Sequence, residues 1–256
     1  MNETLVAEVT MINWSEDDRL WTAMAPALSK PERYSQARKD VGFIEAAMEL
    51  RKGSAVLDMG CGAGTHATAF ALRGYIVTAV DQSECLLHLA VKYAKQNNLP
   101  IEFVQGDMRR FVRPFAYDLA CSLYFSFAYF DDTINVRILK NIHQSLQSDG
   151  VFVLDTIGNG FVNECGNIFT DVEIQGSVYS CHRSFDTEHS MLSEIWTVIS
   201  NGISQQFSTM QRFYQPHELM NMLQAARFKE IEISASLDLT STYNNDSQRM
   251  VAYARA

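Results

Sequence analysis

The sequence predicts an α/β protein in which helices cover both faces of a mostly parallel sheet. Three observations carry this prediction. Short apolar runs alternate with amphipathic segments between residues 55 and 155, a glycine-rich loop follows the first run, and extended segments joined by tight turns begin after residue 172. Near-continuous apolar strands separated by helices are typical of parallel sheets that are buried on both faces.

The core elements follow one another in a regular order. Five segments have the short apolar pattern of buried strands: 55–59, 75–81, 101–107, 117–125 and 151–156. Three segments between them have apolar residues at helical spacing: 65–74, 83–98 and 131–147. Ser83 is suited to cap the second helix, and Asp131 or Asp132 the third. The Asp149–Gly150 pair predicts a turn before the last of these strands.

A different pattern follows the core. Segments 177–186, 191–200 and 204–214 read as extended, and Asn201–Gly202 is a strong hairpin signal between the last two. A helix over 215–228 and strands over 229–237 and 247–256 complete the chain, and another helix is expected over 34–50. We interpret the sequence as one domain in four parts. They are an N-terminal helical cap (1–53), a cofactor-binding core (54–156), a β insertion that roofs the substrate (157–214) and the C-terminal part of the core (215–256).

Composition excludes several classes of protein. The formal net charge is −9, so the broad basic surface that nucleic acid requires is not expected. The five cysteines are odd in number and show no CxxC spacing, so we expect free thiols and no metal site. We expect no signal peptide, because residues 1–18 have no basic region and no long apolar run, and no membrane-spanning segment. A cytoplasmic location follows as an expectation.

The glycine loop gives the first indication of a ligand. Residues 60–64 read G-x-G-x-G, whereas the dinucleotide fingerprint needs a small residue where Thr65 stands. Asp58 precedes the loop and would repel a diphosphate, but it suits a ligand with an ammonium or sulfonium charge. Asp81 ends the next strand, where a carboxylate can accept hydrogen bonds from ribose hydroxyls. Alternatively, Asp58 is a turn residue and Asp81 is a helix cap. Both acids stand at the spacing from the glycines that a ligand site needs, which argues against both alternatives being true at once.

Segment 56–83 resembles the cofactor segment of class I S-adenosylmethionine-dependent methyltransferases, and segments near 104–111, 117–132 and 139–156 resemble that family's next segments in order. The resemblance extends strongly over about residues 40 to 156. It implies a Rossmann-like, doubly wound fold whose last strand is antiparallel, and S-adenosyl-L-methionine as the cofactor.

Carried over residue by residue, the resemblance also implies cofactor contacts. Gly60, Cys61 and Gly62 would pass beside the methionine part, with Asp58 near its amino group. Asp81 would hold the ribose and Gln82 would lie against the adenine. The remaining cofactor candidates are Asp107 at the adenine amino group, Met108 on the ring, Leu123 at the sulfonium end, and Trp21 and Tyr34 from the N-terminal cap.

Candidates for acceptor binding are more open. Tyr124 and Tyr129 belong to the aromatic run after the fourth strand, where core packing is the alternative. Arg183 could bind an acceptor carboxylate, or pair with an acidic neighbour such as Glu194, and Tyr214 could line the pocket or anchor the insertion. His182 is the candidate general base, but it points to the opposite face of its strand from Arg183.

The sequence therefore predicts a methyltransferase that acts on nitrogen or oxygen of a small molecule. The alternative is a cofactor-binding regulatory or partner protein without transferase activity, and a nicotinamide oxidoreductase is disfavoured by Asp58 and Thr65. The sequence leaves open whether the protein forms a homodimer.

Overall fold

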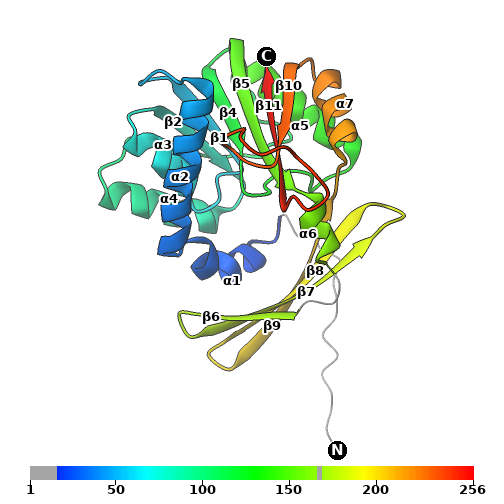
Figure 1. Ribbon diagram of the computed structural model, residues 1–256. Helices are drawn as coiled ribbons and strands as arrows, with labels where there is room; N and C mark the ends of the chain where they lie inside the picture. Colours follow the sequence, from blue (N-terminus) through cyan, green and yellow to red (C-terminus); the bar gives the residue numbers. More distant parts are fainter. Residues whose placement is uncertain (1–15, 166–168) are drawn as a thin grey trace, which may run out of the picture.

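The computed structural model describes residues 16–165 and 169–256. Residues 1–15 lie outside them, and these include the start of the predicted N-terminal cap and most of the segment in which we expect no signal peptide. Its main sheet contains β1 (Ala55–Met59), β2 (Ile76–Asp81), β3 (Ile101–Gln105), β4 (Tyr117–Ser122), β5 (Leu146–Ile157), β10 (Lys229–Ser234) and β11 (Arg249–Arg255). The spatial order is β10-β11-β5-β4-β1-β2-β3. Strand β11 runs antiparallel to both of its neighbours, β5 and β10, and the other adjacent pairs of this sheet are parallel (Figure 1). This confirms the predicted doubly wound, Rossmann-like sheet with an antiparallel last strand.

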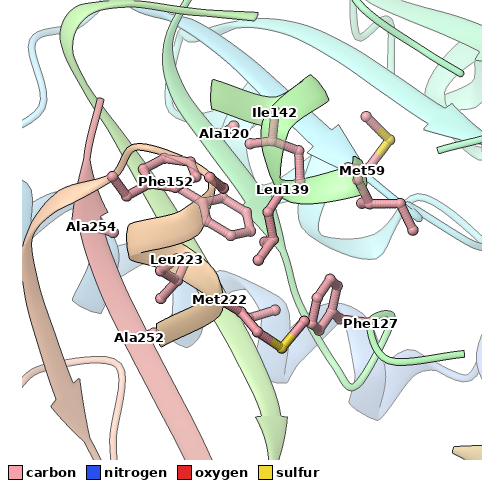
Figure 2. Close-up of a cluster of buried hydrophobic side chains, with 14 of the residues drawn as sticks. Met59, Ala120, Phe127, Leu139, Ile142, Phe152, Met222, Leu223, Ala252 and Ala254 are labelled. Atoms are coloured by element: carbon pink, nitrogen blue, oxygen red, sulfur yellow. The ribbon is translucent and has the colours of Figure 1, made fainter. Parts of the chain in front are cut away.

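Helices cover both faces of this sheet (Figure 1). One face carries α2 (Pro31–Met48), α3 (Thr65–Leu72) and α4 (Glu84–Gln96), whose apolar side chains pack on β1, β2 and β4. The other face carries α5 (Asp132–Ser145) and α7 (Pro216–Ala225). Figure 2 shows this second core, where Leu139 and Ile142 of α5 and Leu223 of α7 meet Phe152 of β5. The sheet is thus buried on both faces, as its apolar strands require.

Local capping explains where two of these helices begin. The Ser83 side chain accepts a hydrogen bond from the backbone N–H of Leu86, and the Asp131 carboxylate accepts one from Ile134. Both predicted caps are confirmed, and each satisfies a backbone donor that the first helical turn leaves without a partner. The Ser83 hydroxyl also donates to Asp18 at 2.7 Å, which fastens α1 (Asp18–Leu28) to the start of α4.

A second, antiparallel sheet forms the predicted insertion. It is a meander of β6 (Phe169–Ile174), β7 (Ser177–Asp186), β8 (Met191–Ser200) and β9 (Ile203–Arg212). Asn201 and Gly202 both have positive φ, at 51° and 75°, so the predicted hairpin turn is confirmed. Strand β6 and the short helix α6 (Asn159–Asn163) were not predicted. In Figure 1 this sheet lies beyond the end of β5 that leads into α6.

Within residues 16–165 and 169–256, no helix is both long enough and apolar enough to cross a membrane.

Leu139 gives a test of the second core. Its side chain is fully buried among α5, α7 and the sheet, so Leu139→Ala should lower the free energy of unfolding by about 2–5 kcal/mol. The matched control is Leu72→Ala, because Leu72 is 51% exposed at the end of α3 and should change stability by less than about 0.5 kcal/mol. Urea unfolding measures both, and equal losses would contradict this description of the core.

Candidate functional site

The glycine loop is a tight turn clamped onto the end of β2. The backbone N–H groups of Gly60 and Cys61 donate to the carbonyl of Val80, at 2.8 and 3.0 Å. The N–H of Gly62 donates to the Asp81 carboxylate at 2.7 Å. Gly60 has φ 76°, and a Cβ there would lie 2.9 Å from the Cβ of Ser126. Glycine is therefore required at position 60 both by the backbone conformation and by the close approach of the loop after β4.

A cleft opens beside this turn, at the edge of the sheet where the parallel strands end. Its walls come from the glycine loop, the ends of β2 and β4, and helices α1 and α2. The predicted residues that line it are Trp21, Asp58, Gly60, Cys61, Gly62, Asp81, Gln82, Met108, Leu123, Tyr124 and Tyr129. Ligands of doubly wound proteins bind at this edge, so most of the cofactor positions carried over by resemblance are brought together where a ligand is expected.

Two carboxylates flank the glycine turn, Asp58, which is buried, and Asp81, which is partly buried. Asp58 is 2% exposed, and burial raises its pKa to about 6. Burial also raises the pKa of Asp81, although backbone N–H groups of Ser83 and Gly62 oppose the shift. A cleft with this charge repels a diphosphate and attracts a cationic ligand.

The Asp58 carboxylate also has unused hydrogen-bonding capacity. Among the described residues, its Oδ2 atom has no hydrogen-bond partner, and its Oδ1 atom is only 3.8 Å from the thiol of Cys121. An unpaired buried carboxylate oxygen is costly, and a ligand ammonium would supply the missing donors. The residues present therefore fit the amino-acid end of S-adenosylmethionine, with Asp58 toward its amino group and Asp81 toward its ribose.

Two of the predicted cofactor residues lie outside the cleft lining. Tyr34 is buried behind the glycine loop, where its ring stacks on Tyr93 and its hydroxyl donates to the carbonyl of Ala63. Asp107 accepts hydrogen bonds from the backbone N–H and the guanidinium of Arg109. Burial would raise the pKa of Asp107, but the bonds from Arg109 hold it below its ordinary value. In this structure Tyr34 supports the loop and Asp107 is held by Arg109.

Three of the candidates for acceptor binding or catalysis also lie outside the lining. The Arg183 guanidinium donates to Glu194 at 2.6 Å across β7 and β8 and lies over the ring of Phe161. His182, next to it on β7, faces the opposite side of the sheet. Tyr214 is 2% exposed, and its hydroxyl donates to Asp132 at 2.6 Å.

The aromatic loop after β4 is held from three directions. Tyr124, Phe125 and Ala128 have φ of 59°, 64° and 72°, a conformation that non-glycine residues adopt rarely. The backbone N–H of Tyr124 donates to the buried Asp155, which pairs with Arg249. From β9, the Gln211 amide donates to the carbonyls of Phe125 and Phe127, at 2.9 and 2.6 Å.

The Gln211 contacts connect the second sheet to the cleft. The loop that Gln211 holds also carries Ser126, whose hydroxyl donates to the carbonyl of Gly60 at 3.1 Å, and Tyr129, which lines the cleft. The strained backbone is therefore fixed by surrounding structure, as such conformations require.

Sequence reasoning missed one wall of the cleft. Arg33, Gln36 and Asp40 lie along one face of α2 and line the cleft together with His66. Asp40 is 2% exposed, accepts a hydrogen bond from Gln36 at 2.9 Å, and lies 3.2 Å from the Nε2 atom of His66. The signal available in the sequence is the spacing of residues 36 and 40, one turn apart on the helix expected over 34–50, with residue 33 one turn before residue 36.

Comparison with known proteins finds methyltransferases. Residues 56–150 match the family model described as "Methyltransferase domain". A ubiquinone biosynthesis O-methyltransferase of Rickettsia canadensis (strain McKiel) is 30% identical over 103 residues, which are 40% of this chain and 42% of that protein. A protein of Geobacillus sp. (strain WCH70), provisionally named a methyltransferase, is 26% identical over 206 residues, which are 77% of this chain and 82% of that protein. The chain thus spans 42% of the length of the Rickettsia relative.

Solved structures match over nearly the whole chain. The CcbJ methyltransferase from Streptomyces caelestis superposes with a TM-score of 0.78 at 21% identity, covering 94% of this chain and 99% of that chain. The amino pentose methyltransferase CalS10 from Micromonospora echinaspora, solved with S-adenosylmethionine bound, has a TM-score of 0.64 at 20% identity, covering 93% and 97%. At these identities the likeness shows the fold.

Residues 56–150 are thus a methyltransferase domain on the fold of the S-adenosylmethionine-dependent enzymes, and the resemblance to class I methyltransferases is confirmed. The match covers this segment, and the likeness to solved methyltransferases extends the fold over nearly the whole chain.

The pKa of Asp58 leads to a test of its role. Since that pKa is about 6, protonation below this value removes the charge that attracts an ammonium. The affinity for S-adenosylhomocysteine, measured by calorimetry, should therefore fall as the pH is lowered, by on the order of ten-fold from about pH 7 to about pH 5. Asp58→Asn should bind more weakly at neutral pH and lose most of this dependence. An identical pH profile in the folded variant would exclude Asp58 as the titrating group.

Proposed function

We propose that the protein transfers the methyl group of S-adenosylmethionine to nitrogen or oxygen of a small-molecule metabolite. The observation that carries the proposal is a pair of acids at the ends of adjacent strands, on either side of the glycine turn. Asp58 is buried and Asp81 is partly buried. A ligand with an ammonium and a ribose fits this pair, and a diphosphate does not.

The cleft supports a small acceptor. Aromatic side chains of Trp21, Tyr124, Tyr129 and Phe130 line it, and helices α1 and α2 close one side. Apolar, partly enclosed walls with a few polar groups are typical of small-molecule sites. Two of the proteins that this chain resembles are named for small-molecule methylation, a ubiquinone biosynthesis O-methyltransferase and an amino pentose methyltransferase.

The residues present act mainly by positioning. S-adenosylmethionine supplies an electrophilic methyl group on a sulfonium when it is bound. Asp58 and Asp81 would orient its two ends, while Leu123 and Tyr124 would pack where the acceptor approaches and exclude water. Orientation of this kind lowers the barrier to displacement without a general base when the acceptor is a neutral amine.

An acceptor hydroxyl would need a base, and the titratable pair in the cleft is Asp40 with His66. His182 remains the sequence-based candidate, although it lies outside the cleft lining. A cytoplasmic setting also stays a proposal, supported by five free cysteines.

Asp81→Ala tests the cofactor assignment. It removes a charged acceptor of ribose hydrogen bonds, each worth roughly 1.5–3 kcal/mol, so the dissociation constant for S-adenosylhomocysteine should rise by about ten-fold or more. Glu84→Ala is the matched control, because Glu84 is an exposed acid in the adjacent first turn of α4 and should leave the constant unchanged. An unaltered constant in folded Asp81→Ala would remove Asp81 from the ribose site.

Methyl transfer is tested with labelled S-adenosylmethionine and two acceptors, an amino sugar and a dihydroxybenzene. Formation of S-adenosylhomocysteine that depends on one of them supports the proposal and chooses between nitrogen and oxygen. Tight cofactor binding without turnover across a wider set of amines and phenols would favour a binding protein without transferase activity.

A further inference from the structure

Helix α1 forms a wall of the cleft but has little apolar packing of its own. It places Trp21 and Leu28 in the cleft lining, and its two buried residues, Leu20 and Ala25, belong to neither apolar core of the main sheet. Figure 1 shows α1 between α4 and the second sheet, and an open groove flanks it on each of these sides. Apolar burial therefore holds α1 less firmly than a helix packed flat on the sheet, which leaves a larger role to polar contacts.

Arg109 supplies one of these polar contacts and joins α1 to another wall of the cleft. Gly106 and Met108, the chain neighbours of Asp107, both line the cleft. The Nε atom of Arg109 donates to the two Asp107 oxygens, at 2.9 and 2.8 Å, and its Nη2 atom donates to Glu16, two residues before α1, at 2.7 Å. Contacts of a guanidinium with carboxylates fix orientation as well as distance. One side chain therefore sets the position of the wall at 106–108 relative to the start of α1.

The flat face of the same guanidinium packs on a third part of the cleft. The Cζ atom of Arg109 lies 4.7 Å from the centroid of the Phe130 ring, within the range of a cation–π contact, and Phe130 lines the cleft. The neighbouring arginines do not share this role, because Arg110 is exposed and Arg113 pairs with Glu102. Arg109 thus contacts three segments that are far apart in the chain.

The wall that Arg109 fixes lies where the proposed function puts the adenine. The backbone N–H of Gly106 donates to the carbonyl of Asp81 at 2.9 Å, so residues 106–108 adjoin the proposed ribose site. A ligand with its ribose on Asp81 and its base near Gln82 and Met108 would lie against this wall. The fit of the base then depends on where residues 106–108 and α1 stand relative to each other.

We propose that Arg109 is a positioning residue that couples binding of the cofactor's adenine to docking of helix α1. The inference rests on the proposed function and deepens it. An adenine held at residues 106–108 stabilises the arrangement in which Arg109 also reaches Glu16, and so stabilises the docked helix. The coupling is reciprocal, so the contact with Glu16 in turn strengthens cofactor binding.

The test compares Arg109→Gln, Arg109→Lys, Glu16→Gln and the double variant of Arg109→Gln with Glu16→Gln. The control is Arg110→Gln, which removes the same charge from the exposed neighbour. Calorimetry gives the affinity of each protein for S-adenosylhomocysteine. Hydrogen exchange measured by mass spectrometry follows the amides of α1 with and without this ligand. Glu16 has a side chain that is 46% exposed, so Glu16→Gln carries the test if the Arg109 variants do not fold.

Glu16→Gln should weaken S-adenosylhomocysteine about two- to five-fold, as expected for a partly exposed ion pair. Arg109→Gln should weaken it about ten-fold, because the bidentate hold on Asp107 is also lost. Arg109→Lys should fall between the wild type and Arg109→Gln, since it keeps the charge and loses the fork. The double variant should bind no more weakly than Arg109→Gln alone, because both residues act through one contact.

Bound S-adenosylhomocysteine should slow hydrogen exchange in α1 of the wild type and of Arg110→Gln, and much less in Arg109→Gln and Glu16→Gln. Unchanged affinity in folded Glu16→Gln, additive losses in the double variant, or equal slowing of exchange in every variant overturns the inference. A loss in Arg110→Gln as large as in Arg109→Gln also overturns it, because charge alone would then account for the effect. A wild-type protein that binds no S-adenosylhomocysteine instead defeats the proposed function.

Discussion

The shape of the cleft depends on the carboxylate of Asp81. One of its oxygens accepts from Gly62 in the glycine turn and the other from Ser83 at the start of α4. The Ser83 hydroxyl then reaches Asp18 of α1, the helix that carries Trp21 to the cleft. A single partly buried acid therefore joins the end of β2, the turn that follows β1 and the N-terminal cap. Desolvation raises the pKa of Asp81, and the hydrogen bonds from the backbone N–H groups of Ser83 and Gly62 reverse only part of that shift.

A second acid, Asp155, holds another wall of the cleft, the aromatic loop after β4. Asp155 is fully buried on β5, where it binds Arg249 of the antiparallel β11 and accepts from the backbone of Tyr124. Together with Gln211 of β9, it holds the aromatic loop in a conformation that the loop would not adopt alone. The insertion thus acts on the cleft through the backbone of this loop, and the residues first expected to reach the acceptor from the insertion are occupied elsewhere.

The parts of the fold predicted from the sequence are those with local signals. Apolar strands and helical spacing predicted the main sheet, Ser83 and Asp131 predicted caps, and Asn201–Gly202 predicted a hairpin. The short strand β6 was missed. Cofactor residues near the glycine loop could be placed because strand ends of a parallel sheet meet at one edge.

The rest of the site depends on contacts between residues far apart in the chain. Arg183 is neutralised by Glu194 through strand register, and Tyr214 is drawn to Asp132 on α5. On α2 the difference between Tyr34 and Arg33 is a rotation of about 100° around the helix axis, which turns one side chain behind the loop and the other into the cleft. A helical pattern predicts the spacing of such residues more securely than the direction in which the helix faces.

A crystal structure with S-adenosylhomocysteine tests the central claim most directly. We expect a ligand whose ribose hydroxyls donate to Asp81, whose adenine lies near Gln82 and Met108, and whose amino group approaches the unpaired oxygen of Asp58. A ligand bound elsewhere on the protein, or one in this cleft with its ribose away from Asp81, would contradict it.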